Sequence, residues 1–238
     1  MVDYFAATGC AQPTSGTATY PQSSYFSATD TTWYTWEAGG LDRIVQVKTY
    51  NHAPEEWSET YTVGDNPLRN DSHGLPAIER DHEGYIHCFF GSHVTPLKYA
   101  HTTNPDDPSA WAQGSDIGSV TTYPKPILVG STLWLFYRKN NGEPRPITFQ
   151  KTTALKGGAA TWSSDSEIIS WDGSRCYAGN FIKRGTELHF MVVRAPEADT
   201  YRRDLFYYIY DTADGSLSNI DGSVSVASGS LPVNLTMS

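Results

Sequence analysis

NDSHGLPAIERDHEGYIHCFFGSHVTPLKY, residues 70–99, is the stretch around which the rest of the chain is organised. It predicts three strands with a tight turn between the first two: strands over 75–80 and 85–90, the turn at 81–84, and a third strand beginning at Leu97. The Asp and Gly of the turn tolerate the positive φ angles that a hairpin needs. Because a hairpin returns the chain to its starting point, we expect His73 and His93 at the same end of the sheet. Two imidazoles brought together beside Gly and Ser residues indicate a site rather than packing.

Four segments of the chain align with one another, each as a strand, a polar turn and the start of another strand. They are residues 44–57, 97–111, 147–162 and 205–219. Trp57, Trp111 and Trp162 recur in them, and a hairpin precedes each segment. One unit therefore has four strands in about 50 residues, the size of a β-propeller blade.

These repeats predict an all-β protein, a β-propeller of four-stranded antiparallel blades that forms a single domain over residues 1–238. The predicted blades cover roughly residues 17–65, 70–118, 121–171 and 174–224. Residues 1–16 and the last stretch of the chain either close the ring or are the stubs of further blades. We therefore expect about four to five blades here, as a small ring or as part of a larger propeller.

The composition agrees with a β protein and limits the partners. Aromatic residues make up 13% of the 238 residues, and 20 Gly and 14 Pro supply frequent turns. The net charge of −9 disfavours nucleic acid and acidic membrane surfaces, so an anionic ligand needs a local basic cluster. Cys10, Cys88 and Cys176 are too few and too scattered for a disulfide framework, and Cys88, in an apolar run, is expected to be a buried thiol.

The sequence shows neither a signal peptide nor a membrane span, so no membrane insertion is expected. We expect an extracellular, secreted protein, exported by another route or with a leader outside this sequence, or else a protein of a virion surface.

Six side chains that can donate a hydrogen bond or carry positive charge fall at equivalent positions of the repeats. Each pair lies at the start of the first strand and the end of the second strand of a blade, which share one rim: His73 and His93, Tyr123 and Arg138, Tyr177 and Arg194. The turns of the opposite rim (DHEG, VGST and KRGT) are typical of solvated loops. The asymmetry indicates a mouth on one face that binds an acidic ligand. Blade packing also explains a recurring Tyr, which makes Tyr177 the weakest member.

Such a set of side chains suits β-elimination on a uronic acid. The C5 proton of the sugar is acidic enough to remove only when the developing enediolate is stabilised, which donors such as Arg138 and His93 on the carboxylate would do. A base must take the C5 proton and an acid must protonate the departing oxygen at C4, for which His73 and Tyr123 are the candidates. No metal, nucleotide or covalent nucleophile is needed, although a structural ion is compatible with the sequence.

Three of these stretches resemble the BNR-repeat propeller family that contains the ulvan lyases and related polysaccharide lyases. They are DSHGLPAIERDHEGYIHCFFGSH (71–93), TTYPKPILVGSTLWLFYR (121–138) and RCYAGNF (175–181), within a resemblance that spans most of residues 20–195. By this resemblance His73 and Tyr123 correspond to residues implicated in proton abstraction and donation, with base and acid left open between them. His93 and Arg138 correspond to the groups that neutralise the uronate carboxylate.

Tyr177 and Arg194 correspond, by the same resemblance, to further substrate contacts. The resemblance implies a lyase that acts on a uronate-containing anionic polysaccharide similar to ulvan and needs no cofactor. Known members are seven-bladed and roughly twice as long. The site of this chain is therefore expected to be open, or to be completed by another chain or by further blades.

A sialidase-type hydrolase is one alternative, because it also places Arg residues on a carboxylate. Its Ser-x-Asp-x-Gly-x-Thr-Trp box is only faintly matched by residues 152–162, and we expect no Asp or Glu beside the two His residues.

A metal site formed by His82, His87, Cys88 and His93 is a second alternative. It requires a bulge, because His87 and Cys88 point to opposite faces of a strand.

A non-catalytic carbohydrate-binding propeller, such as an adhesin of a virus or a cell surface, is the main alternative. Trp33, Trp36 and Trp134 would stack on sugar rings in that case, whereas blade packing is their other role.

Overall fold

The computed structural model describes residues 22–38, 44–68, 71–140, 142, 144–196 and 201–234. These residues form strands and two 3-10 helices, η1 (Ser72–Gly74) and η2 (Ser228–Ser230), with no α-helix among them, so the all-β prediction is confirmed. Nor does the described part of the chain contain any helix with the length and apolarity to cross a membrane. Residues 1–16, with Cys10, lie outside the described residues.

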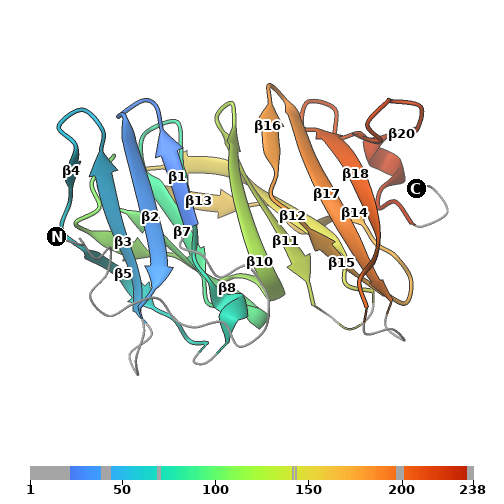
Figure 1. The fold of residues 1–238 in the computed structure, drawn as a ribbon, viewed down its shortest axis with the longest axis horizontal. Coiled ribbons are helices and arrows are strands. Elements are labelled where there is room, and N and C mark those ends of the chain that lie inside the picture. The colour runs from blue at the N-terminus through green and yellow to red at the C-terminus, as the bar shows by residue number, and fades with distance from the viewer. Residues whose placement is uncertain are drawn as a thin grey trace. The chain divides into compact units, whose positions relative to one another are not determined.

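The chain divides into two compact units, the first made of Met1–Pro126 with Ala154–Thr161 and the second of Ile127–Thr153 with Trp162–Ser238. The first unit begins with five antiparallel strands (Figure 1). They are β1 (Gln22–Phe26), β2 (Thr31–Glu37), β3 (Ile44–Asn51), β4 (Glu56–Trp57) and β5 (Tyr61–Asp65). The next strands are β6 (Ala77–Arg80), β7 (Ile86–Phe90), β8 (His93–Thr102), β9 (Trp111–Gln113) and β10 (Ile117–Val129), which continues into the second unit.

The core of the first unit comes from strand residues that alternate between its interior and the surface. In β3, Val45 and Val47 are fully buried while Ile44, Gln46 and Lys48 are half-buried. The hydrophobic core of this unit consists of buried strand residues: Phe26, Trp33, Val45, Val47, Val63, Ile78, Ile86, Cys88, Phe90 and Ala100. Cys88 is thus a buried thiol, as predicted, and burial raises its pKa.

The predicted hairpin is present as β6 and β7, which pair from Ala77 opposite Phe89 to Arg80 opposite Ile86. The third strand, β8, begins at His93 and not at Leu97 as predicted. Its later part pairs with β7, whereas its first residues pair with β10. The first residues of β8 are polar, so the apolar pattern that predicts a strand is absent there. They form a strand because they pair with β10, which is distant in sequence.

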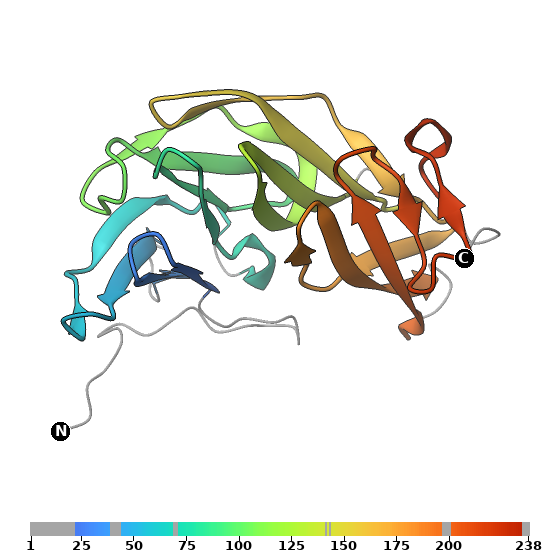
Figure 2. The same cartoon turned by 90° about the horizontal axis from the view of Figure 1, so that it is seen from above.

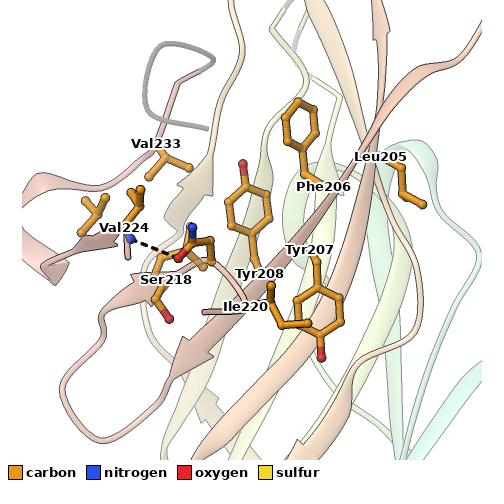
Figure 3. Close-up of a pocket in the computed structure, with 11 residues that line it drawn as sticks. Leu205, Phe206, Tyr207, Tyr208, Ser218, Ile220, Val224 and Val233 are labelled. Atoms are coloured by element: carbon orange, nitrogen blue, oxygen red, sulfur yellow. Dashed lines mark hydrogen bonds between the residues drawn. The ribbon is translucent and has the colours of Figure 1, made fainter. Parts of the chain in front are cut away.

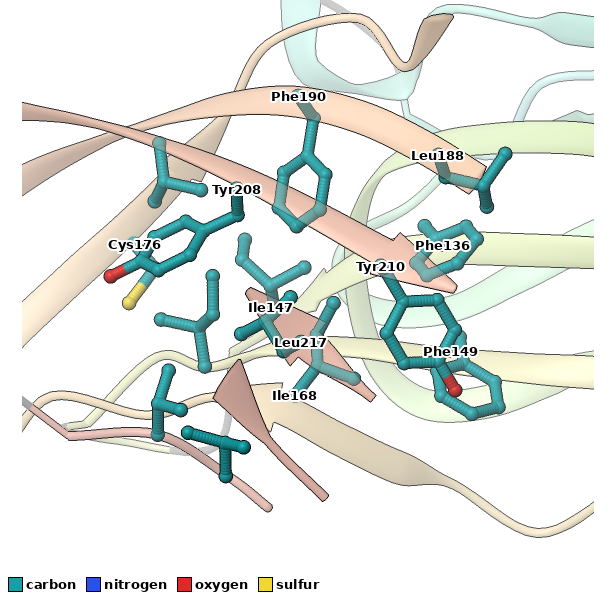
Figure 4. Packing of buried hydrophobic residues seen from close by; sticks show 14 of the residues in the cluster. Phe136, Ile147, Phe149, Ile168, Cys176, Leu188, Phe190, Tyr208, Tyr210 and Leu217 are labelled. Atoms are coloured by element: carbon teal, nitrogen blue, oxygen red, sulfur yellow. The ribbon is translucent and has the colours of Figure 1, made fainter. Parts of the chain in front are cut away.

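The second unit contains the end of β10 and the remaining strands. These are β11 (Thr132–Lys139), β12 (Ile147–Lys156), β13 (Ala159–Trp162), β14 (Ser166–Ile169), β15 (Ser174–Ala178), β16 (Ile182–Arg184), β17 (Glu187–Pro196), β18 (Arg203–Asp211), β19 (Leu217–Ser218) and β20 (Ser225–Val226), with residues 154–161 of β12 and β13 belonging to the first unit. Figure 2 shows the long strands β17 and β18 side by side, in register from Glu187 opposite Asp211. Aromatic and branched side chains from several strands of the second unit pack together in its core, among them Phe136 of β11, Phe149 of β12 and Tyr210 of β18 (Figure 4).

The repeat predicted the strand pattern correctly. Each aligned segment forms a long strand, a turn and a short return strand, namely β3 with β4, β8 with β9, β12 with β13, and β18 with β19. Trp33, Trp36 and Trp134 are 1%, 2% and 4% exposed, so they pack in the interior and are not surfaces for sugar rings.

Candidate active site

His73 and His93 lie together, as the hairpin predicted. Their rings stack with centroids 3.7 Å apart and an interplanar angle of 9°. His73 lies in η1 before β6, and His93 is the first residue of β8, directly after the β7 segment. Their side chains are 19% and 28% exposed, so the surroundings fix the pair while solvent and a ligand can still reach it.

Backbone contacts at two glycines bring the imidazoles together. The N–H of Gly91 donates to the carbonyl of Gly74 at 2.9 Å, and the side-chain amide of Asn66 donates to the same carbonyl at 3.1 Å. Gly91 has φ +70°, and a Cβ there would lie 2.6 Å from Cδ of Pro67. Only glycine permits this approach, so the Gly residues of the motif act on the site through the backbone.

Asp71 bridges the two rings and is a site residue that the sequence did not single out. Its carboxylate accepts a hydrogen bond from Nδ1 of His73 and another, at 2.5 Å, from Nδ1 of His93. Burial raises the pKa of Asp71, but the hydrogen bonds from the His73 backbone and from both rings outweigh burial and lower that pKa. The expectation that no carboxylate lies beside the two His residues is therefore wrong. A local signal was present, because an Asp two residues before His73 is placed to cap the turn.

Tyr123 completes this group, which we call the imidazole site (Asp71, His73, His93 and Tyr123). Its ring centroid lies 5.5 Å from that of His73, and Thr122 of β10 pairs opposite His93 of β8. Register shifts immediately before Tyr123 mark a bulge, and Tyr123 itself has φ 62°. Bulges redirect side chains, and a positive φ costs a non-glycine residue free energy. The backbone thus holds the phenol beside the imidazoles in a strained conformation.

Asp71, His73 and His93 are also the one group of described residues whose donor atoms have the spacing of a cation site, within 4.8 Å of one another. Two ligands of one zinc ion lie about 3.4 Å apart, because each bond is about 2.1 Å long in a tetrahedral arrangement. The 2.5 Å between Asp71 and Nδ1 of His93 is instead a direct hydrogen bond, with no space for an ion between the two atoms.

Arg138 and Tyr177, two predicted site residues, lie together in the second unit. Arg138 is 3% exposed near the end of β11, and its Cζ lies 4.4 Å from the ring centroid of Tyr177. Arg202, which was not predicted, lies 4.6 Å from the same centroid. Burial raises the pKa of Tyr177, but the charges of Arg138, Arg175 and Arg202 outweigh burial and lower it. This cluster of positive charge around a phenol is suited to bind an anion.

Arg194 pairs in register with Cys176, the neighbour of Tyr177 on β15. Its guanidinium, however, is engaged by Asp204, with 2.7 Å between the nitrogen and the carboxylate oxygen. Arg194 therefore lies at the predicted strand position, but its charge is already compensated by Asp204. The repeat did not predict Asp204 as a partner.

The comparison with known families gives the kinship of the chain. A family model described as a BNR repeat-containing family member matches residues 28–238. The chain belongs to this family. The resemblance read from the sequence is therefore confirmed.

Relatives of this family member include ulvan lyases. The enzyme of Alteromonas sp. (strain LOR) is 25% identical over 223 residues, which cover 74% of this chain and 44% of that protein. The ulvan lyase of Nonlabens ulvanivorans is 25% identical over 222 residues, covering 73% of this chain and 45% of that protein. This chain thus spans less than half the length of the curated relatives that it matches.

Solved structures in the same fold include a polysaccharide lyase, the PL25 ulvan lyase bound to -[GlcA(1-4)Rha3S]-. It is 22% identical with a TM-score of 0.83, over 99% of this chain and 60% of that chain. An α-L-arabinofuranosidase from Fusarium graminearum is 15% identical with a TM-score of 0.53, over 84% of this chain and 61% of that chain. The strands of this family member are therefore arranged as in the fold of these solved structures.

The turn at the other end of the hairpin is only partly the predicted solvated loop: His82 and Glu83 are exposed, whereas Asp81 is buried. Asp81 and His87 are both 0% exposed, with 3.0 Å between Oδ2 and Nε2. Nδ1 of His87 lies 2.8 Å from the hydroxyl of Tyr99, which reaches the carbonyl of Gly158 at 3.1 Å. Oδ1 of Asp81 accepts two backbone N–H groups of the turn. This second Asp–His pair is closed off from ligands.

The alternative metal site is not assembled by these contacts. His87 is occupied by Asp81 and Tyr99, Cys88 lies in the apolar core, and His93 belongs to the imidazole site. The predicted ligands therefore lie in separate environments.

The second unit also contains an apolar pocket of about 240 Å³ beside β18 and β19 (Figure 3). It is lined by Leu205, Phe206, Tyr207, Tyr208, Leu217, Ser218, Asn219, Ile220, Val224, Val226 and Val233. Its lining offers no carboxylate, imidazole or guanidinium, so this pocket lacks the charged groups that the polar clusters contain.

Proposed function

We propose that this chain carries a polysaccharide lyase site that cleaves a uronate-containing, ulvan-like polysaccharide by β-elimination. The observation that carries the proposal is the stacked pair of His73 and His93, bridged through Nδ1 by Asp71. Among the described residues neither Nε2 has a hydrogen-bond partner, so both are available to a ligand. The kinship with ulvan lyases supplies the substrate class.

We propose that Nε2 of His73 is the base that removes the C5 proton. Because the ionised Asp71 only accepts, Nδ1 of His73 carries the proton, which leaves the lone pair on Nε2. As His73 takes the proton, the C5–H electrons form the C4–C5 double bond and the bond from C4 to the glycosidic oxygen breaks. Tyr123, beside His73, protonates that oxygen, and solvent then restores both groups.

We assign the uronate carboxylate to His93 and Arg138. When both nitrogens of His93 carry a proton, Nδ1 donates to Asp71 and Nε2 can donate to the substrate carboxylate, and Arg138 supplies a permanent charge. Tyr177 and Arg194 are proposed as further substrate contacts, with Arg194 the weaker because Asp204 already compensates its charge.

The proposal extends to architecture and setting. Strands β1–β5 and β15–β20 form two sheets, and β6–β14 form a third, in which β8 pairs with β10. We propose that this third sheet comprises two of the predicted blades, β6–β9 and β10–β14, which gives four blades for the chain. Further blades or a partner chain are proposed to complete the site, since the relatives are longer. A polymeric substrate fits a secreted, extracellular protein, and the chemistry requires no metal.

The test is ultraviolet absorbance during incubation with ulvan and with other uronate polysaccharides, because elimination creates a conjugated double bond. We expect a rising trace that His73→Ala reduces about 10²–10⁴-fold. His52→Ala, at an exposed His of a turn in the same unit, is the matched control and should leave the rate unchanged. A chelator should leave the trace unchanged as well, and a loss with chelator would overturn the metal-free assignment. A flat trace with glycan binding retained would overturn the lyase and leave a carbohydrate-binding propeller.

A further inference from the structure

Asp71 divides its two oxygens between the two imidazoles. Oδ1 accepts the backbone N–H of His73 at 2.9 Å and also the Nδ1–H of the same residue. Oδ2 accepts the Nδ1–H of His93 at 2.5 Å. Asp71 is the N-cap of η1 and is anchored there by the backbone contact, so each oxygen has a fixed assignment.

We propose that Asp71 is a positioning residue that holds both imidazoles in the Nδ1–H form, with Oδ1 assigned to His73 and Oδ2 to His93, so that both Nε2 atoms face the substrate. The proposal rests on the proposed function for its catalytic consequence. A neutral imidazole carries one N–H, and the partner of one ring nitrogen decides which nitrogen remains for chemistry. In solution the proton of an isolated imidazole is free to sit on either nitrogen. Asp71 removes that freedom from two rings at once.

The stacked geometry supports a single shared anchor over two independent ones. Rings that are 3.7 Å apart and 9° from parallel present their Nδ1 atoms to the same carboxylate, so each Nε2, on the far part of its ring, points away from Asp71. A rotation of either ring would exchange the two edges. The bidentate contact therefore fixes orientation as well as tautomer.

Capping alone would also explain an Asp at this position, and Asp71→Asn separates the two roles. The backbone N–H of His73 requires an acceptor, so it keeps the amide oxygen of Asn at the Oδ1 place. The amide nitrogen then occupies the Oδ2 place and presents N–H to Nδ1 of His93. His73 keeps its Nδ1–H form, whereas His93 must move its proton to Nε2 and can no longer become an imidazolium without a clash of two donors.

The test is long-range ¹H–¹⁵N correlation spectroscopy of the histidine rings, read on the full chain without substrate, together with steady-state kinetics. We expect Nδ1–H at both rings in the unaltered protein, and Nε2–H at His93 alone in Asp71→Asn. Because His93 can no longer donate from both nitrogens, its stabilisation of the developing enediolate is weakened, and we expect kcat to fall about 10²–10³-fold with KM changed less than about threefold, as when one donor to a developing negative charge is lost. Asp71→Ala should release both rings.

The control is Asp107→Asn, because Asp107 caps an exposed turn by accepting from the N–H of Ser109 and touches no imidazole. It should leave ring spectra and rates as they are. Unchanged tautomers in Asp71→Asn, or changed tautomers with an unchanged rate, would each overturn the positioning role. Since the spectra need no substrate, a protein that cleaves no glycan would overturn the proposed function and still leave the tautomers to decide the assignment of Asp71.

Discussion

Two carboxylate–imidazole groups of the first unit contain the same residue types but have different roles. At the imidazole site, Asp71 contacts two rings that are 19% and 28% exposed, and only Nδ1 of each ring is bonded among the described residues. At the turn of the β6–β7 hairpin, Asp81 and His87 are fully buried and both nitrogens of His87 have partners. An accessible imidazole with one ring nitrogen still without a partner can act on a ligand. A buried imidazole whose two nitrogens both have partners can only stabilise the fold.

The energetic consequence is that the two groups should respond differently to the same substitution. A buried carboxylate with satisfied partners leaves several uncompensated groups when it is removed, while a partly exposed one leaves groups that water can reach. The contrast is therefore between loss of stability and loss of activity.

The largest expected effect on stability is that of Asp81→Ala. Removal of Asp81 leaves the buried Nε2 of His87 and two partly buried backbone N–H groups of the turn without their acceptor. We expect a loss of about 3–5 kcal/mol in the free energy of unfolding, measured by urea denaturation. Asp71→Ala, the matched change at the imidazole site, should cost about 1 kcal/mol. Equal losses at the two positions would remove the distinction between them.

A smaller effect is expected from pH, again at the buried pair. Burial lowers the pKa of His87 below its ordinary value and outweighs the neighbouring Asp81, so the folded protein keeps this ring neutral. The unfolded chain binds a proton there below about pH 6.5, so stability present above that pH falls by up to about 1.4 kcal/mol per pH unit on acidification, until the lower folded pKa is reached.

The measurement is the urea midpoint between pH 7 and pH 5.5. His87→Gln should flatten the slope, because it removes the ring that takes up the proton. His52→Gln, at an exposed ring, should retain the slope of the unaltered protein. A slope that survives His87→Gln would assign the proton uptake to another group and contradict the neutral state of His87.

The sequence repeat predicted only part of these two groups, because a repeat encodes strands and turns but not individual side-chain contacts. The aligned segments located the strands and the meeting of His73 with His93, since hairpin topology follows from local turn chemistry and apolar alternation. Asp71 and Asp81 were missed because each acts through a side-chain contact that depends on the position of a partner, and a polar residue near a turn is usually solvated.

The second unit teaches the same lesson. The contact of Arg138 with Tyr177 agrees with the prediction that both lie on one rim, whereas Arg202 and Asp204 were not among the predicted residues. No periodicity predicts which guanidinium is buried against a ring and which one is paired with a carboxylate. Those choices depend on packing between strands that are distant in sequence.

The smallest expected effect concerns backbone strain, which also separates the two groups. At the Asp81 turn the positive φ belongs to Gly84, for which it costs little, whereas beside the imidazoles it belongs to Val94 (φ 62°) and Tyr123 (φ 62°). Val94 is β-branched and 48% exposed, so neither its side-chain packing nor its propensity favours that conformation.

Val94→Gly should therefore raise the free energy of unfolding by about 1 kcal/mol or less, because relief of strain of about 1–3 kcal/mol is partly offset by the backbone entropy of glycine. The same change should lower kcat, since Val94 directly follows His93 and a freer backbone no longer fixes its ring against Asp71. Urea midpoints and initial rates on the same samples measure both. A gain in stability with lower activity would show that the strain serves the imidazole site, whereas a loss in both would mean that Val94 contributes ordinary packing and that strain does not distinguish the two groups.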